Sequence, residues 1–120
     1  MNEKIDYIEQ LKSKSKNIAL RVIRLYQNLP KTGDAQVIGK QLLRSGTSLA
    51  ANYRAACRAR SNAEFFSKIS IVIEETDETM FWLELLWEAQ IMKKELLQDL
   101  YIETESFLKV IVVARKNTVK

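Results

Sequence analysis

Apolar residues recur along most of the chain at alternating intervals of three and four, which is the spacing of one face of an α-helix. The pattern predicts four long helices, at about residues 4–28, 35–59, 62–90 and 95–116. Three Gly and one Pro are too few turn residues for a β-rich fold, so an all-α protein is expected. The positions expected to face a shared core are, in chain order, Ile8, Leu11, Ser15, Ile18, Val22, Leu25, Leu29, Ile38, Leu42, Ser45, Leu49, Asn52, Ala56, Phe66, Ile69, Ile73, Thr76, Met80, Leu83, Trp87, Leu97, Leu100, Thr104, Phe107, Ile111 and Ala114.

Local signals at the helix ends support these boundaries. Pro30 disfavours a helical conformation at the residue before it, and Asp34 is expected to cap the second helix. Ser61 and Glu64 have the S-x-x-E spacing of a capping box at the start of the third helix. Four long helices with short connections predict a single domain over residues 1–120, folded as an antiparallel up-down-up-down four-helix bundle.

The third helix is apolar on more than one face, which indicates burial on more than one side. We therefore expect the chain to form a homo-oligomer through this helix. A partly buried carboxylate on this face requires a basic partner, for which Arg54 or Arg58 is expected. The residues expected at the subunit interface are Ile71, Glu75, Glu78, Phe81, Trp82 and Leu85.

Charge is distributed unevenly along the chain. The net charge is +4, but residues 1–60 hold twelve Lys and Arg against four Asp and Glu, whereas residues 61–120 hold seven against eleven. The basic half can face a polyanion, or it can pair with the acidic half within a subunit or across an interface. The candidate binding residues of the basic half are Arg21, Arg24, Lys40, Arg44, Arg54, Arg58 and Arg60. An acidic stripe on the third helix, interpreted as a surface or interface face, consists of Glu74, Asp77, Glu84 and Glu88.

The sequence lacks residue types and motifs that many enzyme active sites use. Histidine is absent, which removes the commonest general base and most zinc sites, and no Gly-rich phosphate loop is present. Cys57 is expected to be a small packed side chain rather than an activated thiol. We expect no enzymatic activity, no catalytic residue, no metal site, no cofactor and no small-molecule substrate. A single Cys, no apparent signal peptide and no apolar run long enough for a membrane span favour a cytoplasmic protein without membrane contact.

Two stretches carry a resemblance to a known family. They are QLLRSGTSLAANYRAACRARS and the E-x-x-E-T-x-F-W-L-E-L-L form of Glu75 to Leu86. With these motifs the chain resembles the four-helix-bundle proteins linked to intervening sequences in bacterial 23S ribosomal RNA genes, a family distantly related to the accessory variability determinant of diversity-generating retroelements. The resemblance implies a homopentameric ring of four-helix bundles and supplies no catalytic residue. Relatives often end the third helix with Glu-Ala-Gly, where this chain has Gln90 in place of Gly.

Two functions remain open from the sequence. The first is a non-enzymatic homo-oligomer that binds RNA, DNA or a ribonucleoprotein partner through the basic surface of the first and second helices. The second is a structural or adaptor ring for protein–protein interaction, in which the basic face of the second helix pairs with the acidic third helix within or between subunits. In this hypothesis Arg44, Arg54 and Arg58 pair with carboxylates among Glu74, Glu75, Asp77, Glu78 and Glu84. Exposure of the arginines separates the two hypotheses.

Overall fold

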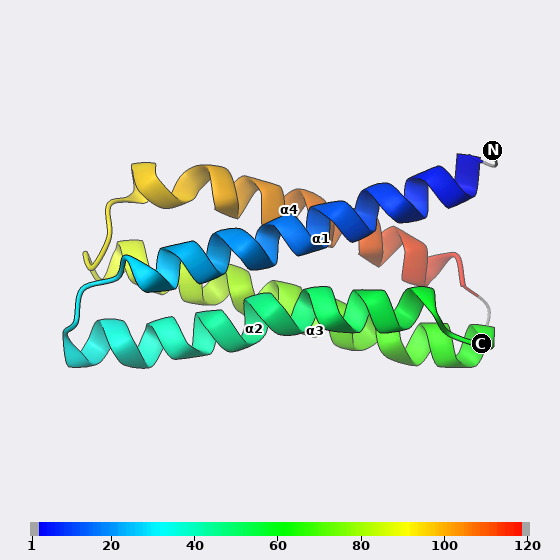
Figure 1. Cartoon of the computed structure of the whole chain (residues 1–120), viewed down its shortest axis with the longest axis horizontal. Coiled ribbons are helices and arrows are strands. Elements are labelled where there is room, and N and C mark those ends of the chain that lie inside the picture. The colour runs from blue at the N-terminus through cyan, green and yellow to red at the C-terminus, as the bar shows by residue number, and fades with distance from the viewer. Residues whose placement is uncertain (1–2, 119–120) are drawn as a thin grey trace.

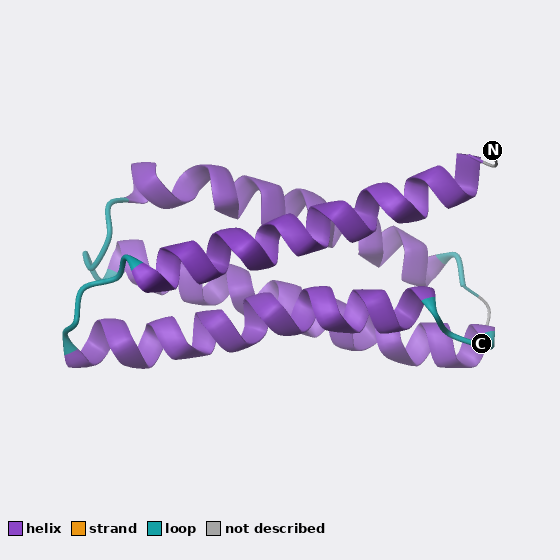
Figure 2. Cartoon of the chain, in the orientation of Figure 1, coloured by secondary structure: helices purple, strands orange, loops and turns teal. Residues whose placement is uncertain are grey.

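The computed structural model describes residues 3–118, with side-chain surroundings from residue 7 onward, and consists of four helices (Figure 1). They are α1 (Glu3–Gln27), α2 (Gly33–Cys57), α3 (Asn62–Glu88) and α4 (Lys94–Lys116). Each helix runs antiparallel to the one before it, and short loops join them (Figure 2). The predicted all-α, up-down-up-down four-helix bundle is therefore confirmed. The bundle measures 45 × 25 × 20 Å, and α1 and α4 close it.

The helix starts agree with the prediction at α3 and differ at α2. Ser61 accepts a hydrogen bond from the backbone nitrogen of Glu64 at 3.0 Å, as the capping box requires. The expected cap at Asp34 is wrong, because α2 begins at Gly33 with Thr32 as its N-cap residue. The Asp34 carboxylate instead accepts hydrogen bonds from the Thr32 hydroxyl and the Ala35 nitrogen, each at 2.8 Å. These hydrogen bonds, the Thr32 hydroxyl first, lower the pKa of Asp34.

The end of α3 lies two residues before the predicted one. The Gln90 nitrogen donates to the Trp87 carbonyl at 3.1 Å, and the Ile91 nitrogen donates to the Leu86 carbonyl at 3.0 Å. This pair of bonds is a Schellman motif, which places the residue after the C-cap in the left-handed region. Gln90 occupies that position with a φ of 60°. The helix thus ends where a Gly is usually found, although the chain has none there.

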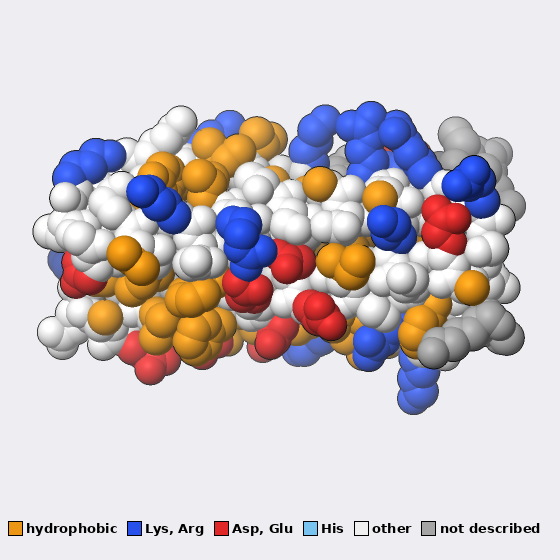
Figure 3. Space-filling model, turned by 90° about the horizontal axis from the view of Figure 1, so that it is seen from below, with side chains coloured by type: hydrophobic (Ala, Val, Ile, Leu, Met, Phe, Trp, Pro, Cys, Tyr) orange, Lys and Arg blue, Asp and Glu red, His pale blue; other side chains and the backbone are white. Residues whose placement is uncertain are grey.

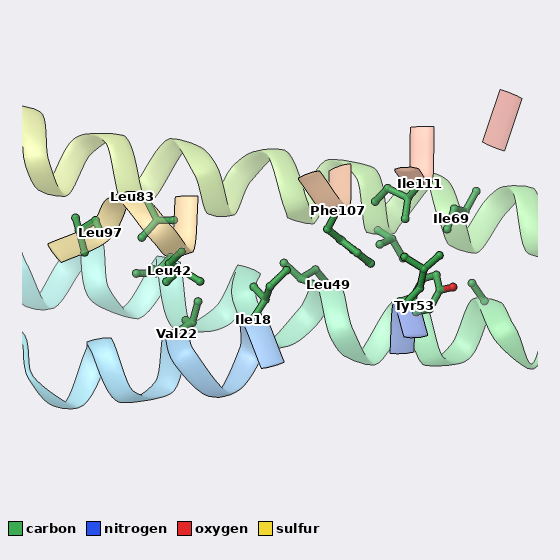
Figure 4. Packing of buried hydrophobic residues seen from close by; sticks show 14 of the residues in the cluster. Ile18, Val22, Leu42, Leu49, Tyr53, Ile69, Leu83, Leu97, Phe107 and Ile111 are labelled. Atoms are coloured by element: carbon green, nitrogen blue, oxygen red, sulfur yellow. The ribbon is translucent and has the colours of Figure 1, made fainter. Parts of the chain in front are cut away.

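The core runs along the length of the bundle and takes side chains from all four helices (Figure 4). Most positions with the predicted spacing are buried, and some of them, such as Ile18, Leu42 and Ile111, are fully buried. Tyr53, which the spacing did not include, is only 4% exposed and packs edge-to-face on Phe107 with ring centroids 5.6 Å apart. The helix α2 therefore buries a wider face than one seam.

Two kinds of small residue explain how α2 packs on both of its neighbours. A Cβ at Gly46 would lie 2.8 Å from Val22 of α1, so only Gly permits this approach. The hydroxyl of Thr79 on α3 donates to the buried Ser45 hydroxyl at 2.9 Å, which links α2 to α3 on its other side. The poor helix formers in the middle of α2 are therefore contact positions rather than a weak point.

Candidate functional site

Arg44 is neutralised within the subunit by two carboxylates of α3. Its guanidinium lies 3.0 Å from the Glu75 carboxylate and also pairs with Glu78, which accepts a further hydrogen bond from the Trp82 indole at 3.1 Å. Burial by itself raises the pKa of Glu78, but the bonds from Arg44 and Trp82 outweigh it and leave that pKa below its ordinary value. The hydrogen bond from Arg44 to Glu78 in turn raises the pKa of Arg44.

This pairing corrects one expectation from the sequence. Arg54 or Arg58 was the expected partner of a partly buried Glu75 or Glu78, but of the three arginines that the second hypothesis considered, Arg44 makes both pairs. Both other arginines are exposed, and neither makes an ion pair within residues 7–118. Of the basic candidates on α2, Arg44 is therefore paired, whereas Lys40, Arg54 and Arg58 make no ion pair with a described side chain.

The remaining basic candidates differ in whether they have a carboxylate partner. Arg21 pairs with Glu103 of α4, and Arg60 lies 3.8 Å from Glu64. Arg24 and Lys40 are exposed and make no ion pair within the described side chains. Two of these four cations therefore have a carboxylate partner, and two have none among the described side chains.

A basic groove lies between α1 and α2 and has a volume of about 460 Å³. Its cations are Lys12 and Lys16 from α1 and Arg54 and Arg58 from α2. The short side chains that leave it open are Ser13, Ser15, Ala50 and Ala51. Lys12 lies 3.3 Å from Glu9, the one acidic residue in the lining, whereas Lys16 makes no ion pair with any described side chain.

Lys12 and Lys16 were not among the site residues expected from the sequence. Their spacing of four residues on α1 places both on one helix face, and they lie off the predicted core positions. That signal alone does not say which part of α2 they meet. The antiparallel packing of α1 on α2 brings them to Arg54 and Arg58.

The expected interface on α3 is partly exposed. Phe81 is 48% exposed and stacks edge-to-face on Trp82 with centroids 5.0 Å apart, while Ile71 and Leu85 are half-buried. Figure 3 shows a cluster of hydrophobic side chains beside acidic ones, with Lys and Arg side chains along other edges of the same view. The monomer therefore leaves apolar surface accessible on its outside.

Cys57 is half-buried next to Tyr53, and burial raises the pKa of its thiol, so the thiolate is disfavoured. Burial likewise raises the pKa of Tyr53. Within the described residues, no group of three or more His, Cys, Asp or Glu side chains is arranged to hold a metal ion. None of the helices, over the residues that the structure describes, is both long enough and apolar enough to cross a membrane.

The fold places the chain in the class of all-α, antiparallel four-helix-bundle proteins. More particularly, the chain belongs to the 23S rRNA-intervening sequence protein family, whose model matches residues 9–113. It is similar to a crystal structure of a protein of unknown function from the S23 ribosomal protein family of Bacteroides thetaiotaomicron, with 34% identity and a TM-score of 0.85. That similarity covers 92% of this chain and 98% of the other. No curated protein matches the chain.

Proposed function

We propose that this protein is a non-enzymatic RNA-binding module that contacts phosphates through the basic groove between α1 and α2. The observation that carries the proposal is the grouping of Lys16, Arg54 and Arg58 in one groove without a carboxylate partner among the described side chains. Unpaired cations around a hollow lined by small residues can neutralise neighbouring phosphates.

The chemistry of the groove favours backbone contacts over base recognition. Its lining contains no aromatic ring on which a base could stack, and its charged side chains are four cations and Glu9. Binding should therefore depend strongly on salt and weakly on sequence. The family, which is named for intervening sequences of 23S rRNA, makes RNA the first nucleic acid to test.

Titration of a labelled stem-loop RNA with the purified protein at several salt concentrations tests this proposal. We expect the logarithm of the binding constant to fall linearly with the logarithm of salt concentration. Arg54→Gln and Arg58→Gln should each weaken binding and reduce the salt slope by about 1, as the loss of one phosphate contact does. A matched control is Lys40→Gln, which removes an exposed, unpaired cation of the same helix outside the groove.

Two results would contradict RNA binding at this groove. One is the lack of any shift at micromolar protein and low salt. The other is an equal loss of affinity in Lys40→Gln and Arg54→Gln, because the net charge alone would then explain the attraction.

We also infer that the subunits assemble into a ring-like homo-oligomer, a homopentamer as the family resemblance implies, through the outer face of α3. The support is the half-exposed Phe81 beside Trp82, together with the Arg44 pairs that give both Glu75 and Glu78 a basic partner on this face. A carboxylate that already has a partner costs less to bury than an isolated one. The same face supports the alternative role as an adaptor ring for other proteins.

Light scattering on the purified protein tests the assembly. Phe81→Glu should reduce the mass to that of a smaller species while circular dichroism retains full helicity, because the side chain is exposed in the subunit. Val37→Glu on α2 is the matched control, since Val37 is 66% exposed and lies outside the expected interface residues. A monomeric mass for the unsubstituted chain would rule the assembly out.

A further inference from the structure

A second groove lies between α3 and α4, on the other pair of helices from the basic groove. Its volume of about 490 Å³ is within the range of ligand-binding clefts. Its walls combine aromatic and apolar surface with carboxylates. The lining residues are Glu84, Trp87, Glu88, Lys94, Gln98, Tyr101, Ile102 and Glu105.

The Trp87 ring in the wall of this groove already contacts a cation of the same chain, Lys94. The rings of Trp87 and Tyr101 pack edge-to-face with centroids 5.0 Å apart, which holds both rings in place. The ammonium group of Lys94 lies 5.4 Å from the centroid of the Trp87 ring, within the range of a cation–π contact. Lys94 is exposed, so another cation can replace it over the ring at little cost.

The carboxylates make the groove acidic overall. Glu84 accepts a hydrogen bond from the Tyr101 hydroxyl at 2.8 Å. Burial, then the bond to Glu84, raises the pKa of Tyr101 to about 12, so the phenol stays a neutral donor at physiological pH. Glu88 is exposed and makes no ion pair with any described side chain, and Glu105 lies 4.0 Å from Lys109 outside the groove. Three carboxylates thus face one lysine.

We propose that this groove docks a basic segment of a partner protein, with a Lys or Arg side chain over the Trp87 ring and Glu88 and Glu105 beside it. Charge complementarity selects this occupant: the excess of carboxylates repels phosphate and attracts cations. The aromatic wall and Ile102 contact the long apolar stem of such a side chain. The proposal is independent of RNA binding, because the basic groove lies between α1 and α2.

The probe is a capped Lys-Arg-Lys-Arg tetrapeptide, titrated into the whole protein. Trp82 and Trp87 are the two tryptophans of the chain, so Trp82→Phe isolates the fluorescence of the groove. Calorimetry on the unsubstituted chain provides a second measurement that does not require the Trp82→Phe substitution. We expect a saturable signal, weakened about tenfold by Glu88→Gln, since a charge-assisted contact contributes about that factor.

Glu74→Gln is the matched control, because it removes an exposed carboxylate of the same helix outside the groove. Unchanged peptide binding in this variant supports the proposal. Equal weakening by Glu74→Gln and Glu88→Gln, or no saturable signal at millimolar peptide, overturns it. Spermidine that binds as tightly as the peptide would overturn the choice of a protein segment as the occupant.

Discussion

At the scale of single residues, local hydrogen bonds decide where helices end and which charges are compensated. Gln90 adopts the left-handed conformation because its nitrogen and that of Ile91 satisfy the last carbonyls of α3. Arg44 and Trp82 both donate to the Glu78 carboxylate, and these bonds outweigh burial and lower its pKa. Neither group lies in the basic groove, so both can be altered without removing its cations.

Gln90→Gly should stabilise the protein. A non-Gly residue in the left-handed region costs about 1–2 kcal/mol, and the greater freedom of Gly in the unfolded chain offsets part of this, which leaves a net gain of about 0.5–1 kcal/mol. Urea unfolding with an unchanged m-value measures it. Gln10→Gly, at an exposed position inside α1, should instead destabilise by about 1 kcal/mol. A loss of stability in both variants would contradict the role given to the conformation of Gln90.

Glu78→Gln should reduce stability in a pH-dependent way. The pKa of Glu78 lies below its ordinary value in the folded state, so its contribution is present above the unfolded pKa and is lost as pH falls through the folded one. The variant should therefore be less stable than the native chain at pH 7, by up to about 1 kcal/mol for a largely exposed pair. The difference should shrink below about pH 4. Urea midpoints at pH 7 and pH 3 measure this, and an equal difference at both would be inconsistent with it.

At the scale of elements, α2 packs on two neighbouring helices, α1 and α3. It contacts α1 through Gly46 and α3 through Ser45, while Arg44 reaches across to the carboxylates of α3. Its motif was one of the two stretches that carried the family resemblance, and the structure gives the physical reason for its composition. Small residues are needed where two neighbours approach closely.

Gly46→Ala should destabilise the protein although Ala is the better helix former. The added Cβ would lie 2.8 Å from both methyl groups of the fully buried, stiff Val22. Overpacking destabilises by about 1–3 kcal/mol, and the better helix propensity of Ala offsets about 1 kcal/mol of this. We therefore expect the free energy of unfolding to fall by about 1 kcal/mol. Thermal and urea unfolding measure it.

Two further variants test whether the close approach of Gly46 to Val22 causes this loss of stability. Gly33→Ala at the start of α2 meets nothing within 4 Å and should change stability little. In the Gly46→Ala, Val22→Ala double variant the losses should be less than additive, by about 1 kcal/mol. Strict additivity would mean that the two positions do not clash.

At the scale of the whole molecule, the first and last helices must meet to close the bundle. The Asn17 amide donates to Glu103 of α4 at 2.9 Å, and Arg21 pairs with the other oxygen of the same carboxylate. One residue of α4 thus holds two successive turns of α1. The closure leaves the basic groove on α1 and α2 and the acidic groove on α3 and α4 separate.

Glu103→Ala should weaken this closure by about 1 kcal/mol, since the contacts are charge-assisted but partly exposed. Amide hydrogen exchange should increase along the facing turns of α1 and α4. Glu105→Ala is the control on the same helix, because its pair with Lys109 is 4.0 Å long and exposed and contributes less than about 0.5 kcal/mol. Equal effects in the two variants would argue against a role for Glu103 in closure.

The sequence by itself determined the four helices, most of their core positions and the cap at Ser61, because helical periodicity and capping depend on residues close together in the chain. It did not determine which of Arg44, Arg54 and Arg58 pairs with Glu75 and Glu78, and the structure shows that Arg44 does. Nor did it place Lys12 and Lys16 beside Arg54 and Arg58. Only the tertiary structure decided these points, because the register between packed helices fixes which distant charges meet.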